Sequence, residues 1–394
     1  MLQRCIRCVI AVLVLAAWLP AGLAVARPPS PARTAIPLPN ASTPAGTLLN
    51  YDRIQLPSLY RAKAWRIIYM TRDFRLRPIV STGMVVLPDR AAKVPMNRRF
   101  VAWAHPTTGI ARKCAPSLRA SPVKAISGLN DLVAAGVVVT ATDYPGLGTE
   151  GPMGYLVGKG QAYAVIDSVR AARQIPGVGG GRDYALWGYS QGGHAALFAA
   201  DLSARYAPEL NLKAVAAVAP PTDLARLLRA NIGSVPGRIL AAFTLASWNA
   251  KYGAPLQMLV DAAAAAVISE VGRSCVDDLG GKLDAAAAQK ALTANFLKTD
   301  PARLAPWSGL LAENSRFAQA VRLPTLIIQG DSDDLVRPAV TTAFVKSSCR
   351  AGVPVQYNVL KGKGHGAAID ASARDGVNWL VSRLNNIPTR GNCR

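Results

Sequence analysis

Ser190 is the residue of this sequence best placed to act as a nucleophile. It stands at the centre of Gly-Tyr-Ser-Gln-Gly, residues 188–192, between a short apolar run and the alanine-rich, helix-forming segment 195–206. This context predicts a sharp turn from a strand into a helix, with the serine projecting from it and the flanking glycines letting both elements pass closely. We expect a strained backbone at the serine, and the positive end of the helix favours an oxyanion nearby. The pattern therefore predicts a nucleophile elbow of the G-x-S-x-G type.

A serine hydroxyl needs a general base near neutral pH, and the chain has three histidines. His365 lies in the glycine-rich loop 361–366, after the last predicted strand and before the last predicted helix, so it can reach the elbow. We predict that it is the base. His194 lies four residues after Ser190 on the following helix, where a role in packing is favoured. His105 precedes a turn-rich loop and is expected to shape that loop.

The acid that orients the histidine should follow a late strand and lie between serine and histidine in the chain. Three carboxylates, Asp331, Asp333 and Asp334, follow the predicted strand 326–329. Asp333 is favoured because it fits a Gly-x-x-Asp-x-x-Val spacing. Asp331 and Asp334 remain alternatives, and Asp223, after the preceding strand, is a further one.

A tetrahedral oxyanion needs preorganised donors, and loss of one typically costs about 2.7–4 kcal/mol. The first is expected to be the backbone N–H of Gln191, directly after the nucleophile. The second is expected from the loop His-Pro-Thr-Thr-Gly at 105–109. Thr108 is favoured, through its N–H with its hydroxyl as an aid, and Thr107 remains an alternative. Pro106 has no N–H to donate.

The elements around these residues alternate between strand and helix. Near-continuous apolar runs such as 137–141 are typical of strands buried on both faces of a parallel sheet. Strands are predicted at 64–69 and 79–87 (a hairpin), 100–104, 137–141, 184–188, 212–218, 326–329 and 355–360, and helices at 126–135, 161–173, 195–206 and 371–384. We predict an α/β fold with a doubly wound, mostly parallel sheet.

Residues 223–317 interrupt this alternation, because no stretch among them has the pattern of a strand. Helix-like segments are predicted at 239–249, 256–271 and 283–297. A helical insertion between two sheet strands is expected to cover the active face as a cap. We therefore predict a catalytic domain formed by 48–222 and 318–394, with a cap or lid at 223–317.

The N-terminal segment 1–26 has the features of a secretory signal peptide. It carries two arginines and no acidic residue, then the apolar run 9–18, and it ends in Ala-Val-Ala. The run is short for a membrane span, although an uncleaved anchor is the alternative, and no later segment is predicted to span a membrane. The segment 27–47 is rich in Pro, Ala and Ser and is predicted to be flexible. We expect a secreted protein, extracellular or periplasmic.

Cysteine usage agrees with export. Two cysteines leave with the signal peptide, and an even number remains for an oxidising compartment. The remaining four are Cys114, Cys275, Cys349 and Cys393. Three pairings are open to them, and a metal site is disfavoured because no C-x-x-C or H-x-x-x-H spacing is present.

The chain is strongly basic, with 45 Lys and Arg against 23 Asp and Glu, a formal charge of +22. Removal of the two arginines of the signal peptide leaves +22 − 2 = +20. The basic residues are dispersed and no nucleic-acid motif is present, so a nucleic-acid partner is not expected. The charge would attract polyanions such as lipopolysaccharide, anionic lipid surfaces or acidic cell-wall polysaccharide, or it simply maintains solubility.

Three stretches together resemble the secretory lipase family of α/β-hydrolases, of the fungal lipase A type and its bacterial relatives. They are 105–109 followed by Cys-Ala-Pro-Ser at 114–117, Asp-Tyr-Pro-Gly-Leu-Gly at 143–148, and Gly-Tyr-Ser-Gln-Gly-Gly at 188–193. The resemblance covers most of the mature chain, including the helical insertion. It implies an α/β-hydrolase fold and a triad of Ser190, Asp333 and His365.

The resemblance also implies the disulfides Cys114–Cys275 and Cys349–Cys393, and no metal or other cofactor. The chain departs from the family at Pro106, where relatives often have glycine after the histidine of the oxyanion loop. Proline has a fixed φ and lacks the N–H.

Residues and resemblance together predict a secreted carboxylic-ester hydrolase that forms an acyl-enzyme on Ser190. Its substrate would be a triacylglycerol or a shorter ester, and the cap would decide between them. One alternative is an esterase acting on acylated cell-wall or polysaccharide material. Another is a serine peptidase of the same fold. The third is a non-catalytic binding protein, against which the intact set of catalytic residues argues.

Overall fold

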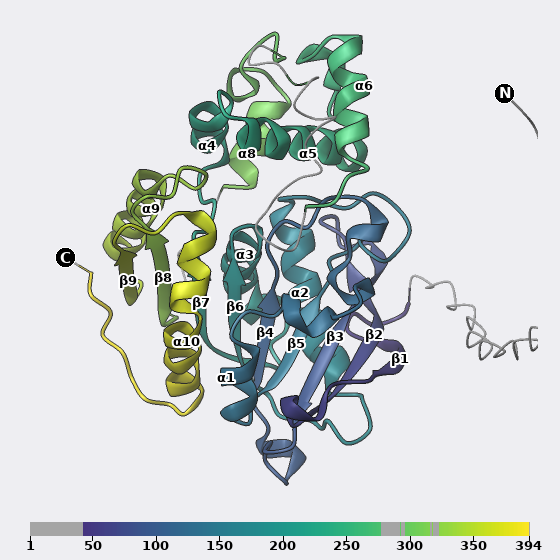
Figure 1. The fold of residues 1–394 in the computed structure, drawn as a ribbon, viewed down its shortest axis with the longest axis vertical. Helices are drawn as coiled ribbons and strands as arrows, with labels where there is room; N and C mark the ends of the chain where they lie inside the picture. Colours follow the sequence, from purple (N-terminus) through teal and green to yellow (C-terminus); the bar gives the residue numbers. More distant parts are fainter. Residues whose placement is uncertain (1–41, 277–291, 293–295, 316, 318–322, 394) are drawn as a thin grey trace, which may run out of the picture. The chain divides into compact units, whose positions relative to one another are not determined.

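The computed structural model describes residues 42–276, 292, 296–315, 317 and 323–393 (Figure 1). The predicted signal peptide, most of the predicted flexible segment 27–47 and most of the predicted helix 283–297 lie outside these residues. The described chain forms one nine-stranded sheet of order β1-β2-β3-β5-β4-β6-β7-β8-β9, with helices on both faces. The predicted α/β class is confirmed.

The sheet is antiparallel at its start and parallel afterwards. Its strands are β1 Leu48–Ile54, β2 Ala62–Arg72, β3 Pro78–Pro88, β4 Phe100–Ala104, β5 Val138–Thr142, β6 Asp183–Tyr189, β7 Asn211–Val218, β8 Thr325–Gly330 and β9 Val355–Leu360. In sheet order, the neighbours from β1 through β2 and β3 to β5 pair antiparallel. The remaining neighbours, from β5 through β4, β6, β7 and β8 to β9, pair parallel. The predicted hairpin is β2 and β3, so that prediction is confirmed.

The beginning of the described chain corrects one prediction, since residues 46–47 of the segment expected to be flexible are held against the sheet. Gly46 is buried, its N–H donates to the carbonyl of Met70 at 2.7 Å, and the N–H of Met70 donates to Thr47 at 2.9 Å. Gly46 has φ +80°, and a Cβ there would overlap the side chain of Arg170. The composition of the segment could not show this distant partner.

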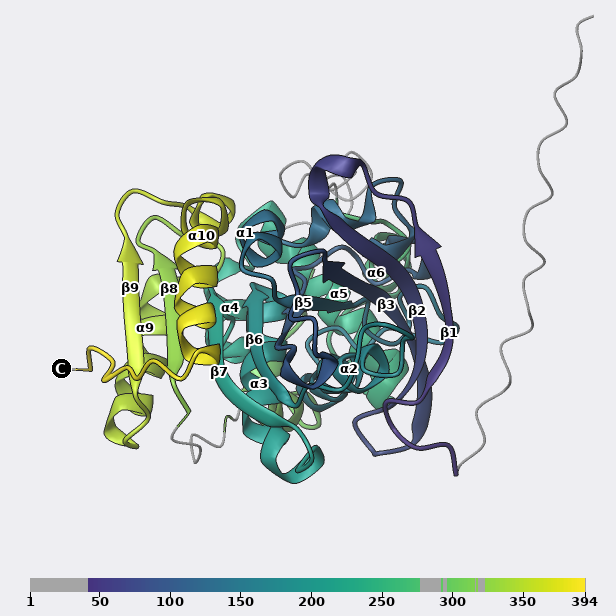
Figure 2. The same ribbon diagram turned by 90° about the horizontal axis from the view of Figure 1, so that it is seen from below.

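The two faces of the sheet are covered by different helices (Figure 2). The helices of the sheet layers are α1 Leu129–Ala134, α2 Gly158–Ala172, α3 Gln191–Tyr206, α9 Pro338–Arg350 and α10 His365–Leu384. α2 and α3 pack on one face and α1 and α10 on the other, each in its own cluster of buried apolar side chains. α9 was not predicted, and α10 begins six residues earlier than predicted, at the residue expected to be the general base.

In the described residues between β7 and β8, four helices gather beyond the sheet (Figure 1). They are α4 Leu224–Asn231, α5 Val235–Tyr252, α6 Ala262–Val271 and α8 Trp307–Glu313. The predicted helix 256–271 is shorter than expected, because Asp261 accepts a hydrogen bond from the N–H of Ala264 and so caps α6 at its start. No helix of the described chain is long and apolar enough to cross a membrane.

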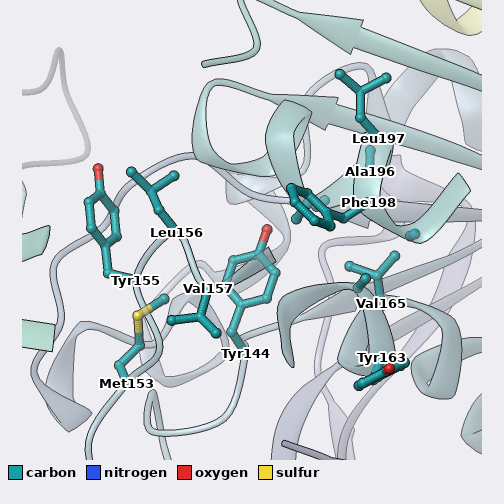
Figure 3. Close-up of a cluster of buried hydrophobic side chains, with 14 of the residues drawn as sticks. Tyr144, Met153, Tyr155, Leu156, Val157, Tyr163, Val165, Ala196, Leu197 and Phe198 are labelled. Carbon is teal, nitrogen blue, oxygen red and sulfur yellow. The ribbon is translucent and has the colours of Figure 1, made fainter. Parts of the chain in front are cut away.

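A loop at 153–157, just before α2, packs into the larger apolar cluster (Figure 3). Its side chains lie against Tyr144 and near residues of α2 and α3 such as Val165 and Phe198. Two residues of the loop, Tyr155 and Leu156, also line the pocket that contains Ser190. The loop therefore connects the core of the sheet layers to the predicted nucleophile.

The C-terminal tail lies along β9. The N–H of Asn392 donates to the carbonyl of Val355 at 2.9 Å, and its side-chain amide exchanges two hydrogen bonds with the backbone of Tyr357, at 2.7 and 3.0 Å. A disulfide between Cys349 and Cys393 ties this tail to the end of α9. The tail is thus fixed both covalently and by backbone pairing.

Candidate active site

Ser190 occupies a strained turn between β6 and α3. Its backbone has φ +53° and ψ −122°, a conformation that residues other than glycine seldom adopt. Its N–H donates to the carbonyl of Val218 at 2.8 Å. A Cβ on Gly192 would lie 1.8 Å from the carbonyl oxygen of Ala104, and one on Gly188 would lie 2.1 Å from that of Gly192. Only glycine fits at these two positions, as the pattern of the elbow predicts.

The structure brings Ser190 together with two residues from loops far along the chain. Nε2 of His365, at the start of α10, lies 3.0 Å from the Ser190 hydroxyl oxygen. Nδ1 of the same ring lies 2.8 Å from an Oδ2 oxygen of Asp333, which follows β8. The ring of Tyr189 packs beside the imidazole with centroids 5.1 Å apart. This geometry suits a base that is oriented by a carboxylate.

The carboxylate of Asp333 is buried and held at both oxygens. Oδ1 accepts from the N–H groups of Leu335 and Val336 at 2.9 and 2.8 Å, while Oδ2 accepts from Gln329 Nε2 at 3.0 Å as well as from His365. Burial alone would favour the protonated acid, but the hydrogen bonds and charge of His365 and the backbone donors outweigh it. The pKa of Asp333 therefore lies below its usual value, and the group is ionised at neutral pH.

Gln329 is a partner of this site that sequence reasoning missed. Its amide nitrogen also donates to the carbonyl of Val336 at 3.0 Å, and its amide oxygen accepts from the hydroxyl of Thr341 at 2.7 Å. It is fully buried at the end of the otherwise apolar β8. A buried polar residue four positions before Asp333 was the signal that could have identified it.

The alternative carboxylates lie elsewhere. Asp331 is exposed and accepts from the N–H of Gly362 at 2.7 Å, and Asp334 is exposed. Asp223 caps α4 by accepting from the N–H of Arg226 at 2.9 Å. Among the described residues, the carboxylate that bonds His365 is that of Asp333 and none of these three.

The two other histidines are buried away from the serine. Nε2 of His194 lies 2.7 Å from the carbonyl oxygen of Asn314, and the ring nitrogens of His105 lie 2.6 Å and 3.2 Å from those of Pro106 and Asp143. Burial lowers the pKa of each histidine to about 4. Both are therefore neutral at pH 7, which agrees with a packing role for His194 and a loop-shaping role for His105.

The loop at 105–109 is fastened on one side to the segment after α6. The carbonyl of Thr108 accepts from the N–H of Val276 at 2.9 Å, and Gly109 forms an isolated β-bridge with Cys275. The disulfide Cys114–Cys275 closes this connection, so both pairings implied by the resemblance are present in the structure.

The two backbone N–H groups predicted as oxyanion donors have no acceptor among the described residues. Within the described residues, the N–H groups of Gln191 and Thr108 donate to no protein group, and the hydroxyl of Thr108 is buried without a partner. The hydroxyl of Thr107 instead lies 2.9 Å from that of Tyr155. The choice between Thr107 and Thr108 as second oxyanion donor stays a prediction.

A pocket extends from Ser190 and Gln191 into the helices between β7 and β8. Its walls are mainly apolar side chains of α4, α5 and α8. They include Leu224, Leu227, Leu240, Leu245, Trp248, Trp307 and Leu311. The few polar wall residues are Tyr155, Asn231 and Thr244. Such a pocket can hold a hydrocarbon chain next to the serine.

In the part of the chain that the structure describes, no group of three or more His, Cys, Asp or Glu side chains is placed to hold a metal ion.

Comparison with known proteins places this arrangement in context. The model of the family described as secretory lipase matches residues 125–392. Lipase A of Arthroderma benhamiae is 27% identical over 381 residues, covering 89% of this chain and 78% of that protein. The structure of Candida antarctica lipase A has a TM-score of 0.76 at 17% identity, covering 89% of this chain and 84% of its own.

A second solved structure of similar architecture is the rice cell wall degrading esterase LipA from Xanthomonas oryzae. Its TM-score is 0.67 at 23% identity, and the match covers 88% of this chain and 98% of that one. At these identities the two structures show the fold alone, which is the α/β-hydrolase fold.

Proposed function

Because this chain belongs to the secretory lipase family, we propose that it is a secreted carboxylic-ester hydrolase that forms an acyl-enzyme on Ser190. The observation that supports this most directly is the unbroken path of hydrogen bonds from Ser190 through His365 to Asp333, at 3.0 and 2.8 Å. The first contact is short enough for proton transfer, and the second orients the imidazole.

Acylation begins when the Ser190 oxygen attacks the ester carbonyl carbon and His365 Nε2 takes the hydroxyl proton. Asp333 accepts the Nδ1–H and stabilises the imidazolium without itself becoming protonated. Its depressed pKa keeps it charged for this purpose. His365 then gives the proton to the leaving alkoxide, the C–O bond breaks, and the alcohol departs.

The oxyanion of the tetrahedral intermediate needs donors that are already in place. The unpaired N–H groups of Gln191 and Thr108 support this role, the first at the N-terminus of the 16-residue α3. Deacylation repeats the sequence with water, which loses a proton to His365 and attacks the acyl carbon. Ser190 regains the proton as the carboxylic acid leaves.

The acyl chain is proposed to occupy the apolar pocket. Its walls come largely from residues 223–317, which supports the division into a catalytic domain and a cap over the active face. Leucine and tryptophan side chains favour a hydrocarbon chain over a polar substituent, so a lipid ester is the preferred substrate class.

A second candidate is an ester of acylated cell-wall or polysaccharide material. The structurally similar protein of Xanthomonas oryzae is described as a cell wall degrading esterase. A formal charge of +20 without the predicted signal peptide would favour approach to acidic polysaccharide. Secretion after removal of 1–26 is part of both proposals, and the two disulfides support it.

The test is hydrolysis of a nitrophenyl ester series from acetate to palmitate by wild type and Ser190→Ala, below and above the solubility limit of each ester. Ser190→Ala is expected to lower kcat by at least about 10³-fold. Highest activity on long chains with a rise at the interface identifies a lipase, while highest activity on short chains favours the esterase candidate. Activity that survives Ser190→Ala refutes the proposed mechanism.

A further inference from the structure

Tyr155 connects the loop before α2 to the loop at 105–109. Its side chain is only 2% exposed, and its hydroxyl lies 2.9 Å from the hydroxyl of Thr107. In Figure 3 the phenol points its oxygen away from the neighbouring Met153 and Val157. The same residue lines the pocket that contains Ser190.

The backbone of Tyr155 is held by α5. Its N–H donates to the hydroxyl of Ser247 at 2.8 Å, and its carbonyl accepts from Trp248 Nε1 at 2.9 Å. The Ser247 hydroxyl in turn donates to the carbonyl of Met153 at 2.8 Å. Since α5 lies in the insertion between β7 and β8, Tyr155 is the residue through which this helix reaches the 105–109 loop.

The 105–109 loop is held at both ends. The hydroxyl of Tyr144 donates to the carbonyl of His105 at 3.1 Å, and the Thr108–Gly109 side pairs with Val276 and Cys275. Between these ends Pro106 lacks an N–H, and the side chain of Thr107 contacts Tyr155. A donor set for an oxyanion works only when it is held rigidly before the reaction.

We propose that Tyr155 is a positioning residue for the oxyanion-binding loop. It acts through Thr107 and couples the position of that loop to the position of α5. The proposal rests on the proposed function. Burial raises the pKa of Tyr155 well above its usual value, so the phenol keeps its proton and can donate to Thr107.

The decisive variant is Tyr155→Phe, which removes one hydroxyl and keeps the ring, including its edge contact with Phe243. With the best nitrophenyl ester, kcat is expected to fall roughly tenfold while KM changes less than about twofold, because only a transition-state interaction is loosened. The matched control is Tyr184→Phe, which removes a buried phenol hydroxyl bonded to Ser203 and is expected to leave both constants unchanged.

A double-mutant cycle with Thr107→Val tests whether the two hydroxyls act as one unit. The double variant should be no slower than the slower single variant, whereas independent roles would make the two losses multiply. Ser247→Ala provides a second route, since it removes one of the two bonds between α5 and the backbone of Tyr155 and leaves the 105–109 loop unchanged, and it should lower kcat by a smaller factor.

An unchanged kcat in Tyr155→Phe, a rise in KM alone, or multiplying losses in the cycle would overturn the proposal. If Tyr155→Phe does not fold, as judged by its thermal transition, Ser247→Ala and Thr107→Val decide the question. Wild type and Ser190→Ala, measured in parallel, distinguish failure of the proposed function from failure of the proposal about Tyr155. Wild type without esterase activity contradicts the proposed function itself, while an active wild type with an unaffected Tyr155→Phe contradicts only the role of Tyr155.

Discussion

Replacing Gln329 by methionine should reveal how far catalysis depends on the support of Asp333. The two side chains have similar volume, so the end of β8 stays filled, but the variant loses the 3.0 Å donor to the Asp333 Oδ2 atom that also receives His365. It also leaves the hydroxyl of Thr341 and the carbonyl of Val336 without their partner.

The size of the effect follows from the kind of bond removed. A hydrogen bond to a charged group contributes about 1.5–3 kcal/mol, so full loss of this contribution in the transition state lowers kcat by about 10- to 100-fold. KM should change less than kcat, because Gln329 does not itself line the pocket and contacts its wall only through the backbone carbonyl of Val336. The free energy of unfolding should fall by about 1–3 kcal/mol from the buried groups left unpaired.

The assay is kcat/KM for a nitrophenyl ester as a function of pH, with Thr341→Val as the control. That control removes the partner of the Gln329 amide oxygen but keeps the donor to Asp333, so its kcat should stay within about threefold of wild type. Gln329→Glu adds a negative charge beside Asp333 and should move the acidic limb of the profile to higher pH. A Gln329→Met enzyme within twofold of wild type, or an unmoved limb in Gln329→Glu, would refute the reasoning.

Two further predictions concern ionisable side chains. Asp333→Asn should lower kcat by about 10⁴-fold, because the imidazole loses its orientation and its counter-charge. The kcat of Asp331→Asn should stay within a factor of two of wild type. Equal losses in the two variants would exclude Asp333 as the acid. His105 and His194, whose pKa burial lowers to about 4, stay neutral in the fold but protonate in the unfolded chain near pH 6.5. Stability should therefore be complete above pH 6.5 and fall as pH drops toward 4, by up to about 3 kcal/mol per histidine, seen as a lower urea midpoint at pH 4.5 than at pH 7. Asp167, whose pKa burial raises to about 6, opposes this trend below pH 6, and an unchanged midpoint would show that the histidines do not control it.

The part of the site that was predictable from sequence depends on local patterns. Glycines around Ser190 specify a turn in which no larger residue fits, and the structure shows the overlaps that a Cβ would cause. Asp333 follows β8, which contains the apolar run Leu-Ile-Ile, and His365 follows β9, where apolar and polar residues are mixed. Because parallel strands end at one side of the sheet, loops after β6, β8 and β9 had to approach each other.

The part that was missed depends on contacts between distant segments. β1 was not predicted because its sequence is half polar and its burial pattern is mostly exposed or intermediate, so pairing with β2 is what makes it a strand. Gln329 and Tyr155 carry no motif, and their importance lies in which atoms they meet after folding. The same holds for Gly46, whose partner Met70 is in another element.

The tail that lies along β9 has a consequence for association between molecules. β9 is the last strand of the sheet, and an uncovered edge strand offers free N–H and C=O groups to which a strand of another molecule can add. Asn392 occupies such groups at Val355 and Tyr357, next to the outward-facing Val359, which is 53% exposed. The disulfide Cys349–Cys393 keeps this cover in place. Because tail and strand belong to one chain, the pairing between them does not depend on protein concentration. In an oxidising environment the tail therefore covers the Val355–Tyr357 part of the edge against intermolecular β-pairing, and reduction of the disulfide would leave this cover held by the hydrogen bonds of Asn392 alone.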